Sequence, residues 1–499
     1  MKQCLILLIC LIFIGCNKQE VLITIEVQEQ PDVNTLIYTV PISGTTYWGF
    51  SDTLKQSETG KFELNLKLTQ PSFITIRDAT SQNRVKLLVE PGNTYHISMM
   101  PQKNAQITGM NERGQMLYTT LPDPSFIEIE LRRWLYNNDT VPFASVHHQI
   151  SELKQTDLSN FKEMLDNKEI TKSYFDLIQK DRDCYYALME TRLLIIKSYE
   201  NYRIRVGSNE DGLTDYLEAI YDQYPINDES LLFSSFWPEY AERFITEYKQ
   251  FVQGDFDIQK LRELRNDGIF HTHIINESKK YLIGQALEYF KAKFIFYECF
   301  EGTYKGSFER EFISLFEQFE TNYPQSEYSK YISPHIDKII DYQKIIENPY
   351  NQGVLFMDNY ETFNTLEEAV KPLRGRKIYI DVWATWCGPC KVEFVHNEAL
   401  KKILAENDIQ LLYISVDRDD YDQQWKNEIK YHQLTGTHIR VNAALSLDLM
   451  KRFDKNAETP YISIPWYILV DEKGNIIEEH AKRPSQLVSG EKLFVDLEL

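Results

Sequence analysis

The chain has no excess of basic residues. Its 499 residues include 54 Lys and Arg against 74 Asp and Glu, which gives a formal charge of −20 at pH 7. Binding to nucleic acid depends on clustered Lys and Arg side chains that displace counterions from phosphates. The composition therefore argues against a nucleic-acid partner.

The N-terminal apolar run is too short to cross a bilayer. Residues 5–14 are apolar and follow the positive charge of Lys2, but a membrane-spanning helix needs about 20 apolar residues. A short run with a charged start is typical of a secretory signal peptide. We therefore predict that residues 1–15 are a signal peptide and that the protein is exported.

Gly15 and Cys16 follow this run directly. A small residue and a Cys at such a place resemble the lipobox of bacterial lipoproteins, in which signal peptidase cuts before the Cys and the Cys is lipidated. Phe13 stands where Leu is usual. The resemblance implies a lipid anchor on Cys16 and, because Asn17 is not the Asp of inner-membrane retention, an outer-membrane position facing the periplasm. The alternative is an uncleaved membrane anchor, which leaves the chain in the same cell-envelope compartment.

Cysteine is scarce in the rest of the chain. Three of the seven cysteines lie within the first 16 residues, so four remain for the folded protein. Cys184 and Cys299 are isolated in the sequence, and we interpret them as buried free thiols, with a disulfide between them as the alternative. Cys387 and Cys390 are only two residues apart. In an oxidising compartment, a pair this close is more often redox-active than structural.

Three stretches of different periodicity predict three domains. Apolar and polar residues alternate in residues 16–110, which predicts an antiparallel β domain. Residues 111–350 contain long, charged stretches with helical spacing of apolar residues and predict a helical domain. Residues 351–499 complete the chain, and a length of 499 residues is well beyond the size of one hydrophobic core.

Strands and helical spacers alternate in residues 351–499, which predicts an α/β layer fold with parallel strands. We expect strands at residues 377–383 and 409–416, helices at 389–405, 421–431 and 445–453, and a final strand pair at 465–470 and 476–479.

The sequence Trp386-Cys387-Gly388-Pro389-Cys390 lies where the first of these strands meets the next helix. This is the crevice at which α/β sheets bind substrates. A thiol attacks only as a thiolate, and a helix N-terminus lowers the pKa of a Cys placed there, so Cys387 is the predicted nucleophile. We expect Cys387 alone of the pair to be exposed, at the start of the helix. Cys390 lies one turn later and deeper, and is predicted to displace a substrate captured on Cys387.

This motif closely resembles that of the thioredoxin superfamily, because the aromatic residue, the Gly-Pro pair and the following helix coincide. The resemblance implies a thioredoxin-like fold, thiol-disulfide oxidoreductase activity, and no cofactor apart from a redox-active Cys387-Cys390 disulfide. Asp381 matches the buried acid of thioredoxin, which implies a catalytic role as a proton relay. Thioredoxin's partner lysine is missing, because Tyr413 falls near that position.

Ile464-Pro465 precedes a predicted strand and resembles the cis-proline loop that faces the cysteines in this superfamily. We expect a cis peptide bond there, and backbone that pairs with an extended substrate chain. An ordinary trans proline at a sheet edge is the alternative. Together with Trp386, Gly388 and Pro389, these residues form the substrate-binding set that the resemblance implies. The implied partners are protein disulfides and a thiol electron donor.

Within the superfamily, the chain is most similar to TlpA-like exported disulfide reductases. Glu393 follows the second Cys as in their Cys-x-x-Glu pattern, and a segment is inserted between Asp417 and Pro465. Val395 replaces the usual proline, so the first helix is expected to lack the family's kink. Residues 59–62 and 89–92 resemble an N-terminal β domain found ahead of thioredoxin domains in exported lipoproteins.

Other functions fit the sequence less well. A peroxiredoxin carries Pro and Thr where this chain has Ile380 and Ala384. A zinc site needs further ligands, and His271 and His273 alternate as on a strand or loop and are expected at the surface, so no metal is predicted. The alternative from another class is a binding or assembly lipoprotein in which the thioredoxin domain is mainly a docking module.

Overall fold

The computed structural model describes residues 19–491, except for residue 31 and residues 81–82, 101–103, 122–128, 130–132, 134–141, 201–211, 254–257 and 455–457. The predicted signal peptide and Cys16 lie outside the described residues. The chain divides into an N-terminal unit, Met1–Glu298 with Ser314–Pro334, and a C-terminal unit, Cys299–Ile313 with His335–Leu499. The three predicted domain boundaries stay a prediction.

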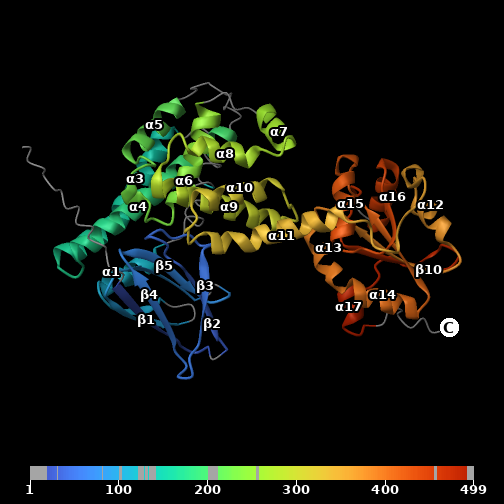
Figure 1. Cartoon of the computed structure of the whole chain (residues 1–499), viewed down its shortest axis with the longest axis horizontal. Helices are drawn as coiled ribbons and strands as arrows, with labels where there is room; N and C mark the ends of the chain where they lie inside the picture. The colour runs from blue at the N-terminus through green and yellow to red at the C-terminus, as the bar shows by residue number, and fades with distance from the viewer. Residues whose placement is uncertain are drawn as a thin grey trace, which may run out of the picture. The chain divides into compact units, whose positions relative to one another are not determined.

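Two four-stranded sheets form the β part of the N-terminal unit (Figure 1), with strand orders β4-β1-β7-β8 and β3-β2-β5-β6. The strands are β1 (Gln19–Val27), β2 (Thr35–Thr39), β3 (Ser51–Lys55), β4 (Phe62–Leu68), β5 (Ser72–Arg77), β6 (Arg84–Val89), β7 (Thr94–Met99) and β8 (Gln106–Gly109). Buried and exposed residues alternate along β4, as its sequence predicts. Side chains from both sheets form a single core.

One strand pair differs from the predicted antiparallel arrangement. β1 is antiparallel to β4 but parallel to β7, with Ile23 opposite Tyr95. The other strand pairs described in the two sheets are antiparallel. Alternation has the same period in parallel and antiparallel strands, so the sequence pattern does not give the direction of a partner.

Helices follow the sheets, as predicted for the middle of the chain. They are α1 (Glu112–Thr120), α3 (Phe143–Asp166), α4 (Lys172–Glu200), α5 (Leu213–Gln223), η2 (Glu229–Leu231), α6 (Trp237–Arg243), the π-helix η3 (Phe244–Val252), α7 (Ile258–Asn266), α8 (Phe270–Ser278), α9 (Gly284–Lys305), α10 (Glu311–Asn322) and α11 (Ser329–Glu347). The division between the two units falls inside α9, α10 and α11. No helix among the described residues is long and apolar enough to cross a membrane.

The expectation of a strand or loop with surface histidines at His271 and His273 is wrong. Both residues lie in helix α8, and His271 is buried. Its buried neighbours Ile274, Ile275 and Ser278 follow it at positions three, four and seven, which is the spacing of one helix face. The two-residue alternation was too short to outweigh this longer period.

The C-terminal unit contains a six-stranded sheet of order β14-β13-β10-β11-β12-β9. Its strands are β9 (Val354–Phe356), β10 (Lys377–Trp383), β11 (Ile409–Ser415), β12 (Gly436–Arg440), β13 (Trp466–Val470) and β14 (Ile476–Glu478). β10, β11, β12 and β9 run parallel to their neighbours in this series, whereas β13 is antiparallel to β10 and to β14. The predicted α/β layer fold is confirmed.

Helices cover both faces of this sheet; in Figure 1, α14 and α17 lie on one side of β10, and α15 and α16 on the other. The elements are η4 (Tyr360–Thr362), α12 (Leu366–Val370), η5 (Lys371–Leu373), α13 (Gly388–Glu393), η6 (Phe394–His396), α14 (Asn397–Glu406), η7 (Asp419–Tyr421), α15 (Asp422–Tyr431), α16 (Ala443–Phe453) and α17 (Pro484–Val488). Because both faces are covered, every residue of β10 after Lys377 is buried.

The helix after the cysteines is interrupted, although Val395 replaces the proline that is usual in the family. The 3-10 turn η6 separates α13 from α14, so the expectation of an uninterrupted helix is wrong. Packing accounts for the interruption. Phe394 is buried, with its ring centroid 5.3 Å from that of Trp383. The carboxylate of Glu393 accepts hydrogen bonds from the backbone N–H and the hydroxyl of Ser485.

Candidate redox site

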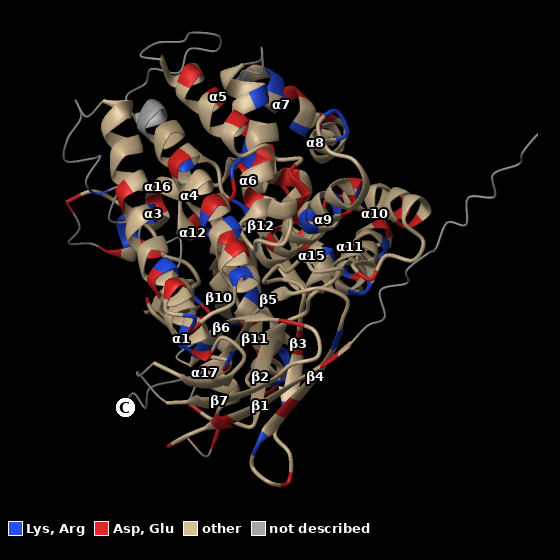
Figure 2. Ribbon diagram, turned by 90° about the vertical axis from the view of Figure 1, so that its left-hand side faces the viewer, with Lys and Arg blue, Asp and Glu red and all other residues tan. Residues whose placement is uncertain are grey.

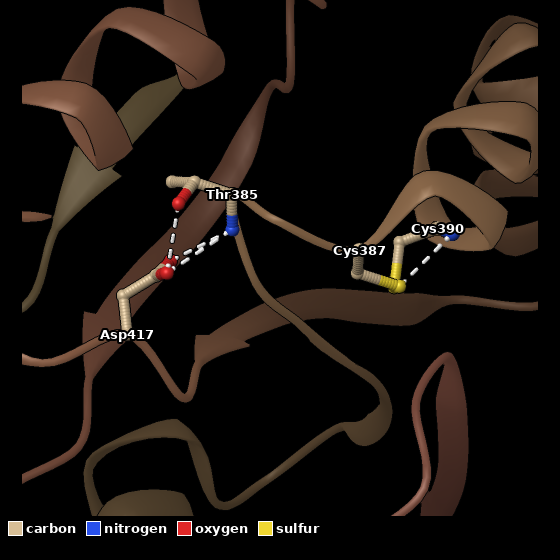
Figure 3. The surroundings of a disulfide bond; sticks show 4 residues. All are labelled: Thr385, Cys387, Cys390 and Asp417. Carbon is tan, nitrogen blue, oxygen red and sulfur yellow. Dashed lines mark hydrogen bonds between the residues drawn. A yellow bond between two sulfur atoms is a disulfide. The ribbon is translucent and has the colours of Figure 1, made fainter. Parts of the chain in front are cut away.

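Cys387 lies between strand β10 and helix α13. It precedes the first turn of the helix, and its Sγ accepts a hydrogen bond of 3.1 Å from the backbone N–H of Cys390 (Figure 3). Pro389 occupies the first turn, where a missing N–H leaves no bond unmade. The backbone donor and the positive end of the helix both stabilise negative charge on this sulfur.

Cys387 and Cys390 are joined in a disulfide, with their Cα atoms 5.3 Å apart. Cys390 has no exposed surface and Cys387 is only 3% exposed. The expectation that Cys387 is exposed is therefore wrong for this oxidised form, because its sulfur is bonded to a residue inside the core. Its deeper partner is Cys390, as the sequence predicts.

Three of the residues predicted to bind substrate are exposed and lie next to the disulfide cysteines in the chain. Trp386 is 61% exposed, and Gly388 and Pro389 are exposed beside it. The Ile464-Pro465 peptide bond is cis, which confirms the predicted geometry. Trp466, the residue after the cis proline, pairs with Val382 near the end of β10. The cis proline therefore lies at the end of the sheet at which the redox loop follows β10.

Asp381 is fully buried in β10, and its carboxylate has no hydrogen-bond partner among the described residues. Burial raises the pKa of Asp381 well above its ordinary value, and the charge of Glu393 raises it further. Tyr413 of β11 and Tyr467 of β13 stand directly opposite Asp381 on either side. Tyr413 thus occupies the position predicted for the missing lysine, and the role of Asp381 in proton transfer stays a prediction.

A second buried carboxyl group, Asp417, was not among the predicted site residues. It follows β11 and accepts hydrogen bonds from the backbone N–H of Thr385 at 2.9 Å, from the Thr385 hydroxyl at 2.8 Å and from the Ser415 hydroxyl at 2.8 Å (Figure 3). Burial raises the pKa of Asp417, while the hydrogen bonds from Ser415 and Thr385 oppose this rise.

Asp417 therefore fixes the backbone of Thr385, two residues before the nucleophile. The sequence carried a signal for it. The carboxyl ends of adjacent parallel strands meet at one edge of a sheet, so an Asp just after β11 lies near the loop that follows β10.

Cys184 and Cys299 are both buried thiols outside any disulfide, which confirms the favoured interpretation over a bond between them. Burial raises the pKa of the Cys184 thiol well above its ordinary value, so this thiol is held neutral. Neither residue belongs to the redox pair.

Comparison with known proteins identifies the family. The Redoxin family matches residues 364–489, a range that contains Cys387, Cys390 and Pro465. The C-terminal domain belongs to the thioredoxin superfamily. Within the superfamily this thioredoxin domain is TlpA-like, as its Cys-x-x-Glu pattern indicates. The predicted fold of this part of the chain is thereby confirmed.

Relatives of the thioredoxin domain cover about a quarter of the chain. The thiol-disulfide oxidoreductase ResA of Bacillus thuringiensis is 26% identical over 110 residues, which are 22% of this chain and 57% of ResA. The thioredoxin-like protein YneN of Bacillus subtilis is 26% identical over 136 residues, 27% of this chain and 74% of YneN. A Bacteroides vulgatus protein of known structure, assigned to the thiol-disulfide oxidoreductases, is 32% identical, with 25% of this chain and 75% of that chain covered and a TM-score of 0.21. The chain thus spans little more than half the length of ResA.

Proposed function

We propose that the protein is a thiol-disulfide oxidoreductase that reduces protein disulfides in the cell envelope through Cys387 and Cys390. One observation carries this proposal: the Cys387 sulfur stands at the start of α13, accepts the Cys390 backbone N–H, and is joined to Cys390 in a disulfide. The Redoxin match and the names of ResA and YneN support the same chemistry.

The reaction begins with the reduced dithiol. The Cys387 thiolate attacks one sulfur of the substrate disulfide, that S–S bond breaks, and the departing substrate sulfur takes up a proton. The Cys390 thiol then loses its proton and attacks the Cys387 sulfur. The second substrate thiolate leaves, two electrons have passed to the substrate, and the Cys387-Cys390 disulfide forms. A thiol donor restores the dithiol by the same exchange in reverse.

Substrate contact is proposed for the exposed residues beside the disulfide. Trp386 offers a large apolar surface, and Gly388 is exposed beside open space. The backbone before the cis proline, at Ile464, is proposed to pair with an extended substrate segment in the manner of an added strand.

Trapping tests the order of the two cysteines. Cys390→Ser should accumulate mixed disulfides through Cys387, because the captured substrate has no thiol to displace it. Cys387→Ser should trap nothing. Adding Cys184→Ala to Cys390→Ser is the matched control and should leave trapping unchanged, since Cys184 is buried elsewhere. Equal trapping by Cys387→Ser and Cys390→Ser would contradict the assignment, and trapping by neither would favour the docking-module alternative.

The proposed direction is reduction, because Gly388-Pro389 and Ile464 are the residues of thioredoxin at these positions. Thioredoxin has a potential near −270 mV, against about −120 mV for the oxidant DsbA, and this gap corresponds to about 7 kcal/mol for two electrons. Equilibration of the full chain with glutathione buffers measures the potential. A value below about −220 mV would support a reductase, and one above about −150 mV would make the protein an oxidase or isomerase.

The proposed location is the periplasmic face of the outer membrane, with a lipid on Cys16. This part of the proposal rests on the sequence of the signal segment, which lies outside the described residues. Metabolic labelling with a fatty-acid probe should label the wild type, and Cys16→Ala should abolish the label. An unlabelled wild type would overturn the anchor and leave the redox proposal untouched.

A further inference from the structure

The N-terminal unit contains a cavity of about 960 Å³ that has no part in the redox chemistry. It lies between the sheet β3-β2-β5-β6 on one side and residues of α4, α6, η3 and α9 on the other. Binding sites for small molecules have volumes of roughly 300–1,000 Å³. The cavity is therefore large enough for a ligand of that kind.

The sheet side of the cavity is basic. Arg77 of β5 pairs directly with Arg84 of β6, and Thr75 pairs with Lys86, so these side chains share one face of the sheet. All four line the cavity. Alternate residues of the same strands, such as Ile76, point to the other face and into the core. The strand period therefore gathers the three cations on the cavity side.

The helix side of the cavity carries charges of both signs. Glu239 pairs with Arg192 and Arg243, and Glu247 also pairs with Arg243. The Lys293 ammonium, which is almost fully buried, pairs with Glu242. Figure 2 shows acidic and basic residues intermixed along α4, the helix of Arg192.

The whole lining has an excess of positive charge. Among its described residues, six side chains are cationic and three are anionic. Each of the three glutamates pairs with a cation of the helix side. On the sheet side, Arg77 and Lys86 donate hydrogen bonds to the backbone carbonyls of Asp78 and Leu121, which leave the charges of these cations in place. A local excess of cations in a chain of charge −20 favours an anionic ligand, because a partly enclosed site strengthens the attraction between opposite charges.

Aromatic residues add an apolar surface at the same place. Tyr47, Trp48 and Tyr297 line the cavity, and Trp48 is 50% exposed. The Lys293 ammonium lies 4.8 Å from the ring centroid of Tyr297. The hydroxyl of Thr46 also lines the cavity, is buried, and has no hydrogen-bond partner among the described residues. A buried hydroxyl without a partner is costly, and a ligand oxygen would relieve that cost.

We propose that this cavity binds a small anion that carries a carboxylate or phosphate group on a flat or apolar body. The cations of β5 and β6 attract the charged group, and Tyr47, Trp48 and Tyr297 contact the apolar part. Neither Cys387 nor Cys390 lines the cavity, so this proposal is tested separately from the redox proposal.

Anilinonaphthalene sulfonate, an aromatic anion that fluoresces when bound, is the probe. The wild-type chain should bind it, and Arg77→Gln with Arg84→Gln should weaken binding at least tenfold. Trp48→Ala should reduce the fluorescence gain without loss of the fold, which circular dichroism checks. Lys55→Gln is the matched control, since Lys55 is an exposed cation on the same sheet outside the cavity, and it should change nothing.

Competition separates the two kinds of charged group. Displacement of the probe at lower concentration by inorganic phosphate identifies a phosphate site, and displacement at lower concentration by citrate identifies a carboxylate site; either result supports the proposal. The proposal is overturned if neither anion displaces the probe. It is also overturned if the Arg77 and Arg84 substitutions together leave the affinity as it is in Lys55→Gln.

Discussion

Two buried carboxyl groups of the C-terminal unit, Asp381 in β10 and Asp417 just after β11, have opposite surroundings. Asp417 accepts hydrogen bonds from three donors of Thr385 and Ser415. Asp381 has no partner among the described residues. Burial raises the pKa of both, but hydrogen bonds oppose the rise at Asp417, whereas the charge of Glu393 adds to it at Asp381.

This difference separates two uses of a buried acid. A carboxylate whose oxygens are satisfied holds the groups that donate to it, so it fixes local structure. A carboxyl group without partners is desolvated in its charged form, so it retains a proton to higher pH and is suited to proton transfer. We therefore propose that Asp417 positions the redox loop and that Asp381, in the strand before it, transfers a proton.

The largest effect is expected for Asp417→Ala. The substitution leaves the Thr385 N–H, the Thr385 hydroxyl and the Ser415 hydroxyl without their acceptor. Each buried group left unpaired costs about 1–3 kcal/mol, so we expect a loss of about 3 kcal/mol in the C-terminal unit. Hydrogen exchange at the Thr385 amide should accelerate, and disulfide reduction should slow about tenfold because the loop before Cys387 is no longer fixed.

Asp417→Asn is the control for this prediction. Its amide oxygen can still accept hydrogen bonds, so both effects should be smaller than in Asp417→Ala. Wild-type protection of the Thr385 amide in Asp417→Ala would refute the positioning role.

Asp381→Asn tests the proposed role of Asp381. Unlike Asp417→Ala, which should lower the stability of the C-terminal unit, this substitution should raise it. The pKa of Asp381 is raised above its ordinary 3.8. From pH 3.8 up to the raised pKa, the unfolded chain releases this proton while the folded chain keeps it, so the wild type loses stability as pH rises through that window. Asn cannot ionise, so the variant should gain stability relative to the wild type with rising pH.

The same variant should slow the release of a mixed disulfide by about tenfold, because Cys390 loses its proton acceptor. Stopped-flow measurement of the release across pH would report the rate, and hydrogen exchange of the β10 amides would report the stability. Asp358→Asn, an exposed acid of the same unit, is the matched control. A rate profile equal to that of the control would remove Asp381 from the mechanism.

Tyr413→Lys should restore beside Asp381 the lysine that thioredoxin has at this position. Tyr413 stands opposite Asp381 in the sheet. A cation there favours the ionised carboxylate, so the midpoint of the pH profile of mixed-disulfide release should fall by about one unit. Tyr413→Met, which fills the space without charge, should not lower it. Equal midpoints in the two variants would show that charge at this position does not control Asp381.

The sequence predicted the local parts of this site well. The run of buried residues in β10 and the Cys-Gly-Pro-Cys motif depend on neighbours in the chain, and β10 has the predicted bounds of residues 377–383. The predicted position of Tyr413, at the place of thioredoxin's lysine, is confirmed by its pairing with Asp381. This prediction needs only the pairing of two consecutive strands.

Parts that depend on distant residues were missed. The bonds between Asp417 and Thr385 join residues 32 positions apart and need the carboxyl ends of β10 and β11 to be adjacent. The parallel pairing of β1 with β7 and the cavity lined by Arg77 and Lys293 likewise depend on tertiary packing. Periodicity within a segment carries no information about such contacts.

The smallest effect on the redox loop is expected for Ser415→Ala, which leaves both Thr385 bonds in place. The substitution removes one of the three donors to the Asp417 carboxylate and the hydroxyl that accepts the Asp417 backbone N–H. Each hydrogen bond contributes about 1 kcal/mol, so the loss should be smaller than in Asp417→Ala, where three buried donors lose their acceptor. Since the Ser415 bond opposes the raised pKa of Asp417, its removal should raise that pKa further. Because the pKa of Asp417 is raised in the folded protein, the folded state loses stability as the pH rises above 3.8. Ser415→Ala should therefore be more destabilising at pH 8 than at pH 4.

A double-mutant cycle with Asp417→Asn measures the coupling by hydrogen exchange of the Thr385 amide. Additive effects would mean that Ser415 acts apart from Asp417, and the contrast with Asp381 would then rest on Thr385 alone.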